Sequence, residues 1–347
     1  MKKNFEHWFG LQLHITDDCD QRCEHCYIFN DPSFEGHNLS FADIKSIVVN
    51  FESFCESMEC NPYLSITGGD PLLRKDIWEI LEYIHQRNIS FSIMGNPFHL
   101  TQTVANRLFS LGCEKYQLSI DGLEETHDKI RKKGSFATTL DALQILNNSG
   151  IISQVMMTIS KKNYIETPDV VRLLEQKSVR SFSFARYCPT PADKDLDYIS
   201  PQEYKEFLST MWNVYQELAN GKTKFPLKDH LWTLFLYENG LFQLQEDDMI
   251  YEWCGCAIHH MTVLPNGEVY ACRRFNSSIG DALKTPFKEI FFGKEMEQYR
   301  DYEKMECYNC ELFNYCRGCP AVSHGIYGTF YKKDPQCWKN IDINKKG

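Results

Sequence analysis

The sequence lacks several features that would place it among membrane, secreted or nucleic-acid-binding proteins. No apolar run approaches the roughly 18 residues of a membrane span, and the start, MKKNFEHWFG, lacks the apolar stretch of a signal peptide. Positive charge is also scarce, with 37 Lys and Arg against 47 Asp and Glu, for a net charge of −10. Because non-specific binding to DNA or RNA depends on Lys and Arg contacts with phosphates, a nucleic-acid partner is disfavoured. We expect a cytoplasmic protein without a membrane partner.

Cysteine is the residue type in excess. The 347 residues include 15 cysteines, an odd number, while a hydrophobic content of 43% is enough for a core without disulfides. In a reducing compartment such a number indicates metal or redox chemistry. We expect Cys55, Cys60 and Cys113 to be packing residues. Cys188 ends a predicted strand on the expected active face, where a donor or substrate-contact role competes with simple packing.

Short β-rich runs alternate with amphipathic segments over the first half of the chain. Strands are expected at residues 11–16, 63–67, 90–94, 116–120, 152–159 and 181–186. Ser40 and Thr167 stand where helices would begin, and Gly112 and Gly150 where helices would end. This alternation predicts an α/β fold with a parallel sheet, a partial (β/α)6 TIM-type barrel.

The pattern changes after Pro189. A capping box at Ser200 and Glu203 predicts a helix to about residue 219, and a second helix is expected near 228–241. Residues 261–272 predict a hairpin that turns at 265–267, followed by a helix after Pro286 and a cysteine-dense segment of loops. We therefore expect three domains: the barrel at 1–196, a helical bridge at 197–250 and a cysteine-rich domain at 251–347.

The first cysteine cluster follows the first predicted strand as Cys19-x3-Cys23-x2-Cys26. In a βα barrel this loop lies at the carboxyl end of the strand, where active sites occur. Three local thiolates suit a [4Fe–4S] cluster that leaves one iron open to a ligand. The alternative is a zinc site completed by His14, His25 or His37.

The order of strand, CxxxCxxC, helix and then TGGDP after the second strand resembles the radical S-adenosylmethionine (SAM) superfamily. The resemblance implies that the three-cysteine cluster binds SAM through its open iron and reduces it to a 5′-deoxyadenosyl radical. Gly68, Gly69, Asp70 and Pro71 resemble the family's GGEP loop. Its glycines let the backbone approach a ligand closely, and its carboxylate helps to hold the SAM ammonium group.

Further cofactor-binding residues follow from the same resemblance. Ser119, Asp121 and Arg131, in the segment YQLSIDGLEETHDKIR, match positions that contact SAM in relatives, and Asn96 stands after the third strand where relatives often have Asn-Gly. The simpler interpretation places Asp121 in a turn and Arg131 on a solvated helix face.

The carboxyl-terminal cysteines resemble the SPASM extension of radical SAM enzymes. Eight of them match the number that two fully ligated [4Fe–4S] clusters require. By family analogy, one auxiliary cluster takes Cys254, Cys256, Cys272 and Cys319, and the other takes Cys307, Cys310, Cys316 and Cys337. The expected cofactors are thus three [4Fe–4S] clusters and SAM. A pair of zinc sites is the alternative, because C-x2-C pairs also form zinc ribbons.

The resemblance implies an oxidative enzyme that acts on a peptide or protein. The leading hypothesis is maturation of a ribosomally made peptide through a thioether or carbon–carbon crosslink, with a flavodoxin- or ferredoxin-type electron donor. Only about ten residues precede the first strand, so recognition would use the barrel mouth, the 190–250 helices or a separate peptide-recognition protein.

Two other functions remain open. An anaerobic sulfatase maturase, or another SPASM dehydrogenase, is one alternative, although Arg273 and Arg274 follow Cys272 where sulfatase maturases have a catalytic Asp. A non-catalytic zinc or iron–sulfur adaptor is the other.

Overall fold

The structure, a computed structural model, describes residues 5–30, 35–189, 199–245, 249–251 and 254–339. Its contacts divide the chain into two compact units. The first contains Met1–Ser119, His127–Val155 and Cys256–Arg300, and the second contains Ile120–Thr126, Met156–Gly255 and Asp301–Gly347. The three domains expected from the sequence remain predictions, and the boundary at 196 lies outside the described residues.

A mostly parallel sheet organises the first unit. Its strands in the described residues are β1 (His7–His14), β2 (Cys60–Thr67), β3 (Ser90–Met94), β4 (Cys113–Ser119), β7 (His260–Val263), β8 (Glu268–Tyr270) and β9 (Ser278–Asp281). Their order is β4-β3-β2-β1-β7-β8-β9. The pairs from β4 to β7 are parallel, whereas β8 pairs antiparallel with β7 and β9. The predicted α/β class with a parallel sheet is confirmed.

The predicted hairpin is present, but it also extends this sheet. β7 and β8 turn through Gly267, whose φ of 89° suits glycine. In addition β7 pairs in parallel with β1, with Gly10 opposite His260 and Leu13 opposite Val263. The sequence pattern predicted the turn but neither this partner nor β9, because a pairing across about 250 residues leaves no local signal.

Helices follow the strands of the first unit in alternation. They are α1 (Phe41–Ser57), α2 (Ile77–Gln86), α3 (Gln102–Ser110), α5 (Ser135–Ser149), α9 (Phe287–Phe291) and α10 (Lys294–Glu297), with 3-10 turns η1 (Pro71–Leu73) and η3 (Gln298–Arg300); α4 (Glu124–Ile130) begins in the second unit. Ser40 caps α1 as predicted, in a reciprocal capping box with Asp43 that stabilises the helix by about 1 kcal/mol. Gly112 and Gly150 follow α3 and α5 with positive φ, as expected at helix ends.

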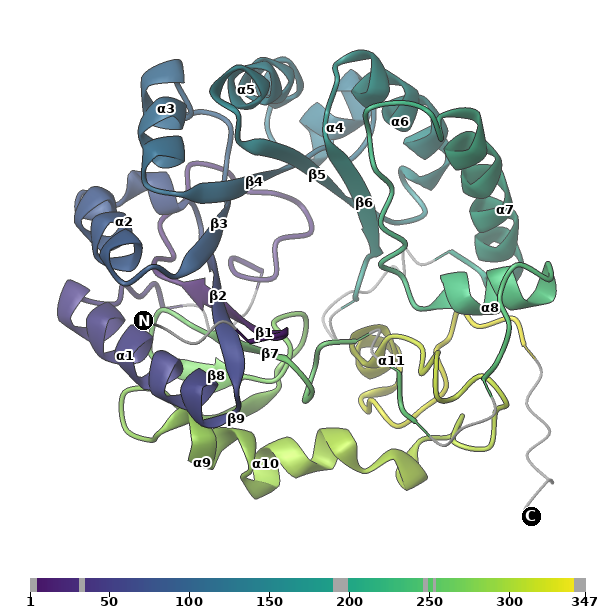
Figure 1. The fold of residues 1–347 in the computed structure, drawn as a ribbon. Coiled ribbons are helices and arrows are strands. Elements are labelled where there is room, and N and C mark those ends of the chain that lie inside the picture. Colours follow the sequence, from purple (N-terminus) through teal and green to yellow (C-terminus); the bar gives the residue numbers. More distant parts are fainter. Residues whose placement is uncertain (1–4, 31–34, 190–198, 246–248, 252–253, 340–347) are drawn as a thin grey trace. The chain divides into compact units, whose positions relative to one another are not determined.

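The two faces of this sheet differ in chemistry. One face carries buried apolar side chains, including Leu11, Leu13, Leu64, Ile66, Phe91, Ile93 and Met261. Figure 1 shows α1, α2 and α3 on this outer side of the strands. The opposite face carries polar side chains at the alternate positions, namely Gln12, His14, Ser65, Thr67, Ser92, Lys115, Gln117 and Thr262. The purple segment that follows β1 lies on this polar side (Figure 1).

An aromatic cluster attaches the last helices of the first unit to its first strand. The Phe9 ring packs edge-on against Phe54 and Phe291, with centroids 4.9 and 5.3 Å away. Phe51 and Phe287 complete the cluster at 5.8 Å from each other. All five rings are buried, so α9 belongs to the core of this unit although it lies far along the chain.

The second unit carries β6 (Ser181–Arg186) and the second half of β5 (Ile152–Ile159), both with the predicted bounds. Its helices are α6 (Thr167–Gln176), α7 (Pro201–Glu217), α8 (Leu231–Glu238) and α11 (Pro320–Tyr327), with η2 (Tyr164–Glu166) and η4 (Tyr302–Lys304). The capping box at Ser200 begins α7 as predicted. Thr167 is the first residue of α6 rather than its cap. α11 lies in the segment that was expected to contain only loops.

Candidate functional site

The three clustered cysteines lie on the segment that follows β1, all in the first unit and all half-buried. Two of their thiols accept hydrogen bonds from polar groups. Cys19 Sγ accepts from the Gln21 backbone N–H at 3.4 Å and from Asn96 Nδ2 at 3.2 Å. Cys23 Sγ accepts from Arg131 Nη1 at 3.6 Å. Burial raises the pKa of Cys19, while the bonds from Gln21 and Asn96 act in the opposite direction and favour a thiolate.

Asn96 and Arg131 therefore reach the cysteine loop itself. Asn96 Nδ2 also donates to Asp20 Oδ1 at 2.9 Å, and the Asn96 carbonyl accepts from the Tyr116 hydroxyl at 3.2 Å. Arg131, in the α4–α5 connection, carries the positive charge that faces Cys23. Both residues were expected to bind the cofactor; the structure places them against thiols that are its predicted ligands, and their direct contact with SAM remains a prediction.

The Gly-Gly-Asp-Pro loop packs on the backbone that leads to the first cysteine. The Gly69 N–H donates to the Thr16 carbonyl at 2.8 Å, and the Asp70 N–H donates to the Asp18 carbonyl at 2.7 Å. A Cβ on Gly68 would lie 2.1 Å from the Thr16 oxygen, and one on Gly69 would lie 2.1 Å from the Asp18 oxygen. The sequence suggested that these glycines admit a ligand. The structure shows a further need for them, the close approach of the loop to residues 16–18, and their approach to a ligand remains a prediction.

The buried environment of the Asp70 carboxylate suits the binding of a cation. It is fully buried, its Oδ1 accepts from the Leu72 N–H at 3.2 Å, and its Oδ2 has no hydrogen-bond partner. Burial raises the pKa of Asp70 to about 6. A buried, unpaired carboxylate oxygen is costly, and an ammonium group would satisfy it. The site thus fits the SAM ammonium group, which Asp70 and its loop would hold.

Two further residues beside Asp70 were not predicted from the sequence. Ligating atoms of Asp20, Asp70 and His99 all lie within 4.8 Å of one another. His99 Nε2 is 3.2 Å from Asp20 Oδ2, and the Lys132 ammonium donates to the Asp20 carbonyl at 3.2 Å. The Asp20 carboxylate adds to the negative potential around Asp70. Its position directly after Cys19 was the available sequence signal.

Replacing Asp70 with asparagine is expected to stabilise the protein while weakening SAM binding. Raising the pKa from 3.8 to about 6 means that the folded protein disfavours the ionised carboxylate by about 3 kcal/mol. That cost grows as pH rises from about 4 to about 6 and is complete above pH 6. The asparagine variant should therefore unfold at a higher temperature than the parent at pH 8, with little difference near pH 4, and its SAM affinity in equilibrium dialysis should fall at least about tenfold.

Asp76→Asn provides the matched control. Arg74 donates to both Asp76 oxygens, at 2.9 and 2.7 Å, and lowers the pKa of this carboxyl. Its replacement should reduce thermal stability at pH 8, the opposite sign, with SAM affinity unchanged. Unaltered SAM binding by Asp70→Asn would contradict the assigned role.

The other predicted cofactor residues occupy different settings. Pro71 begins η1 directly after Asp70, and Ser119 ends β4, half-buried. Asp121 lies in the second unit, fully buried, where its Oδ1 accepts from the Thr158 N–H at 2.8 Å and its carbonyl accepts from Asn163 Nδ2 at 3.0 Å. These bonds give Asp121 a role in holding the end of β5, and its SAM contact remains a prediction.

Four carboxyl-terminal cysteines line one pocket in the second unit. Cys307, Cys310, Cys316 and Cys337 surround it together with Leu231, Leu234 and Gly318. Burial raises the pKa of Cys307 to about 12 and that of Cys316 further. A metal that replaces the four thiol protons would remove this cost, and four thiolates complete the shell of a [4Fe–4S] cluster or a zinc ion. The cysteines predicted to form one auxiliary site are thus brought together.

The second predicted set of four divides between the two compact units. Cys254 and Cys319 belong to the second unit, and Cys256 and Cys272 to the first, so this grouping remains a prediction. Burial opposes a charged His230, yet its hydrogen bond with Cys254 raises the pKa of this histidine. Cys256 forms an isolated β-bridge with His260, and the Cys272 N–H donates to the Ser277 hydroxyl at 2.9 Å.

The remaining cysteines fall into two groups, three buried packing residues and Cys188 at the end of a strand. Cys55, Cys60 and Cys113 are buried packing residues. The Cys188 thiol lies 3.9 Å from the Arg186 carbonyl, just beyond β6. Its predicted donor or substrate-contact role is untested and remains a prediction.

Comparisons with known proteins agree with this arrangement. The radical SAM superfamily model matches residues 13–174, and the SPASM model, an iron-sulfur cluster-binding domain, matches residues 254–320. This chain is a radical SAM enzyme with a carboxyl-terminal SPASM domain. The adaptor hypothesis is therefore set aside.

Similar proteins extend over nearly the whole enzyme. An AdoMet-dependent heme synthase from Methanosarcina barkeri is 24% identical, covering 93% of this chain and 94% of the relative. The mycofactocin maturase MftC from Mycobacterium tuberculosis is 28% identical, covering 94% and 82%. The structure of SuiB from Streptococcus suis bound to S-adenosylmethionine superposes with a TM-score of 0.76 at 16% identity, covering 96% and 78%. This likeness confirms the predicted fold class.

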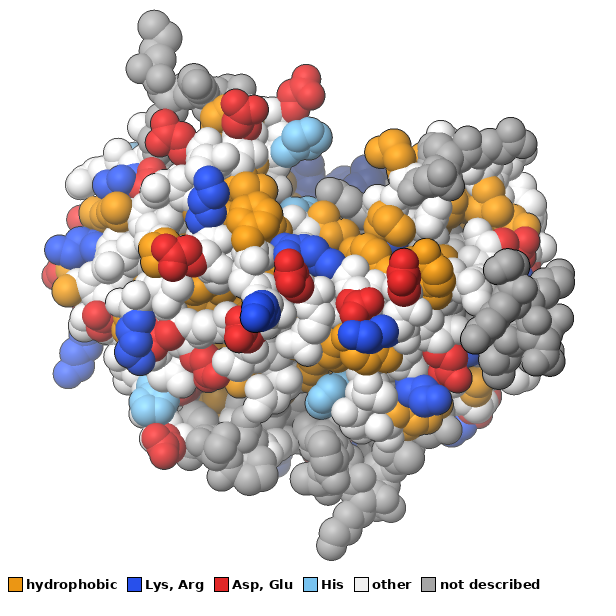
Figure 2. Space-filling view, turned by 90° about the horizontal axis from the view of Figure 1, so that it is seen from below, with side chains coloured by type: hydrophobic (Ala, Val, Ile, Leu, Met, Phe, Trp, Pro, Cys, Tyr) orange, Lys and Arg blue, Asp and Glu red, His pale blue; other side chains and the backbone are white. Residues whose placement is uncertain are grey.

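Charged side chains of both signs are mixed on the surface. Over the described residues of the face in Figure 2, Lys and Arg side chains are interspersed with Asp and Glu side chains. Within the described part of the chain, no helix has both the length and the apolar character needed to cross a membrane.

Proposed function

We propose that this radical SAM/SPASM enzyme oxidises a side chain of a ribosomally made peptide and forms a thioether or carbon–carbon crosslink. Cys19, Cys23 and Cys26 would hold the SAM-binding [4Fe–4S] cluster, and the eight carboxyl-terminal cysteines would hold two auxiliary clusters. Together with SAM, the first cluster would supply a 5′-deoxyadenosyl radical for hydrogen abstraction. A low-potential donor of the flavodoxin or ferredoxin type would supply the electron.

The protein's own groups hold and orient the reacting partners. The buried Asp70 carboxylate would bind the SAM ammonium group, and the Gly69 and Asp70 N–H bonds hold this loop on the backbone before Cys19. Asn96 and Arg131 direct N–H groups at the Cys19 and Cys23 sulfurs. Hydrogen bonds to cluster sulfurs are among the factors that set iron–sulfur potentials.

The polar face of the sheet supports a peptide as the substrate. Ser65 and Ser92 lie 3.3 Å apart across β2 and β3, and Gln12 Nε2 lies 3.1 Å from His14 Nε2 on β1. The Lys115 ammonium lies 5.2 Å from the centre of the Tyr63 ring. A peptide could hydrogen-bond to such polar side chains through its backbone, which offers one donor and one acceptor per residue. The names of two similar proteins, the mycofactocin maturase MftC and the subtilosin biosynthesis protein AlbA, also support a peptide.

A second candidate is oxidation of a haem precursor. It is favoured by the coverage of the heme synthase relative, 94% of whose length this chain matches. Such a substrate is held by its carboxylates and its apolar ring, so it requires cationic side chains free to meet it. The buried Arg186 does not supply one, because Asp229 and Asp334 bind its guanidinium, and Lys115 is the cation that the polar face offers.

The deciding measurement is mass spectrometry of a short cysteine-containing peptide encoded beside the gene. The peptide is incubated anaerobically with reconstituted enzyme, SAM and dithionite. We expect a loss of about 2 Da per crosslink, with one hydrogen atom passing to SAM-derived deoxyadenosine and the second leaving as a proton to solvent and an electron that the auxiliary clusters would accept. The variant with Cys19, Cys23 and Cys26 all changed to alanine should leave the peptide unchanged.

One outcome would redirect the assignment. Deoxyadenosine release with an unchanged peptide would overturn peptide crosslinking, and parallel incubations with a sulfatase-derived cysteine peptide and with iron coproporphyrin would identify the alternative. A sulfatase peptide is expected to stay unmodified, since Arg273 and Arg274 follow Cys272 where sulfatase maturases have an acid.

A further inference from the structure

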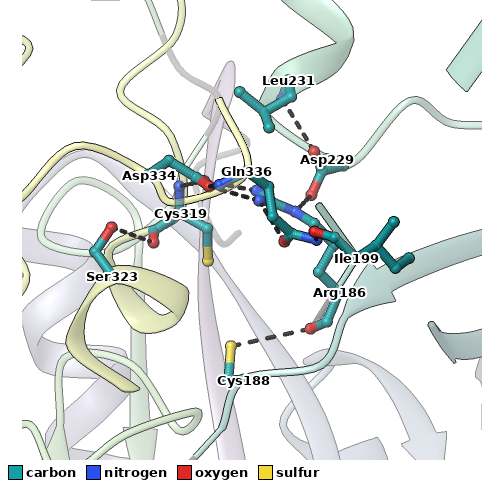
Figure 3. A network of polar contacts seen from close by, with 9 residues as sticks. All are labelled: Arg186, Cys188, Ile199, Asp229, Leu231, Cys319, Ser323, Asp334 and Gln336. Atoms are coloured by element: carbon teal, nitrogen blue, oxygen red, sulfur yellow. Dashed lines mark hydrogen bonds and ion pairs between the residues drawn. The ribbon is translucent and has the colours of Figure 1, made fainter. Parts of the chain in front are cut away.

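A buried ion network lies at the end of β6 in the second unit. The Arg186 side chain is 1% exposed. Its Nε donates to Asp229 Oδ2 at 2.7 Å, its Nη1 to Asp334 Oδ1 at 2.7 Å and to Gln336 Oε1 at 2.9 Å, and its Nη2 to Asp334 Oδ2 at 2.8 Å. Figure 3 shows the guanidinium between the two carboxylates, with Gln336 against its edge. One cation thus joins β6, the start of α8 and the carboxyl-terminal segment.

Asp334 also holds the backbone of two predicted cluster ligands, one through its carboxylate and one through its main-chain carbonyl. Asp334 Oδ2 accepts from the Cys319 N–H at 2.7 Å, and the Asp334 carbonyl accepts from the Cys337 N–H at 3.0 Å. Gln336 precedes Cys337, and its own Nε2 donates to the Ile199 carbonyl at 2.9 Å. Arg186 fixes both carboxylate oxygens of Asp334, and by holding this residue in place it positions the two cysteine backbones that Asp334 binds.

Stability alone does not account for this network. A buried ion pair is often no more stabilising than apolar residues of the same volume, because both charges lose their hydration. Here one guanidinium meets two carboxylates, which leaves a formal charge of −1 beside anionic thiolate sites. A fixed charge and fixed N–H groups near an iron–sulfur cluster set its potential and geometry.

We propose that Arg186 is a positioning residue for the auxiliary iron–sulfur centres, acting through Asp334 on Cys319 and Cys337. This inference rests on the proposed function for its clusters, although not for its peptide substrate. The predicted ligand sets place Cys319 and Cys337 in different clusters, so the single residue Asp334 holds a ligand of each, Cys319 through its carboxylate and Cys337 through its main-chain carbonyl. The Arg186 carbonyl also accepts from the Cys188 thiol, so the same strand end places that thiol beside the network.

The test compares Arg186→Met, Arg186→Lys and the double variant Arg186→Met with Asp334→Asn. Each is made in the full reconstituted chain with Cys19, Cys23 and Cys26 changed to alanine, so that only auxiliary clusters contribute to the electron paramagnetic resonance spectrum. Removing the cation should shift the auxiliary midpoint potential to a more negative value and change the spectrum. Arg186→Lys should recover the potential more fully than the spectrum, since it restores charge but not the forked hydrogen bonds.

The double variant guards against a simple failure to fold. It has the formal charge of the parent network, and it should recover iron content and potential while retaining an altered spectrum. In chains with the first cysteine cluster intact, SAM cleavage without peptide should stay within about twofold of the parent, because Arg186 acts through Asp334 on the carboxyl-terminal cysteines and not on Cys19, Cys23 or Cys26. Arg172→Met, which removes an exposed arginine paired with Glu217, should change none of these properties.

Two results would overturn the proposal. One is an Arg186→Met protein with the parent's iron content, spectrum and potential. The other is an equal loss of SAM cleavage and of auxiliary iron in both the single and the double variant, which indicates general destabilisation. None of these measurements uses a peptide, so a failure to crosslink would refute the proposed function and leave this test intact.

Discussion

Replacing Gly69 with alanine is expected to reduce SAM cleavage by at least about 100-fold, equivalent to about 3 kcal/mol. The new Cβ would lie 2.1 Å from the Asp18 carbonyl oxygen, a backbone atom that the Asp70 N–H already holds at 2.7 Å. Relief requires residues 17–19 to move, and Cys19 would move with them. The measurement is deoxyadenosine release by chromatography, together with iron content after reconstitution.

Gly240→Ala is the control for this prediction. Gly240 has a φ of 69°, and a Cβ there would meet no atom within 4 Å. The substitution should cost about 1 kcal/mol through backbone strain alone and leave SAM cleavage unchanged. Parent activity in Gly69→Ala would contradict the close packing of the two loops.

Replacing Cys316 with serine is expected to remove about four irons from each chain. Cys316 lines the pocket with the other three cysteines of its set, and serine is a poor ligand for iron. The last 40 residues have few regular elements, with α11 the main one in their described part. Metal binding to such a segment supplies about 10 kcal/mol or more of its folding free energy. The variant should therefore become sensitive to proteolysis after residue 301 and lose peptide oxidation.

Cys113→Ala tests whether this effect is specific to the pocket. Cys113 is 3% exposed at the start of β4, and burial raises its pKa to about 12. Its replacement should cost about 1 kcal/mol in stability through a small cavity, with iron content unchanged. Full iron content in Cys316→Ser would show that this residue is not a ligand.

Much of the fold follows from local sequence. β3, β5 and β6 have the predicted bounds, because alternation and flanking turn residues are local properties. The capping boxes at Ser40 and Ser200 begin α1 and α7 for the same reason. α11 escaped prediction because its residues, which start at Pro320 among the cysteines, resemble a loop.

The cysteine spacing indicated the chemistry, but the neighbours of each thiol required the fold. Asn96 and Arg131 were assigned to SAM, and the structure shows that they donate to Cys19 and Cys23. Asp20 and His99 were not selected at all. A residue's contacts across about 80 to 110 positions depend on strand register and loop packing, which no short motif encodes.

The sequence by itself determined the strand–helix alternation, the position of the three-cysteine loop after β1 and the family of the enzyme. These depend on periodicity, turn chemistry and spacing within a few residues. Only the tertiary structure decided that β7 joins β1, that Gly69 serves the approach to Asp18 and that Arg186 meets Asp334. Such contacts depend on which surfaces remain to be buried once the chain is compact, and on which buried charges must then find a partner.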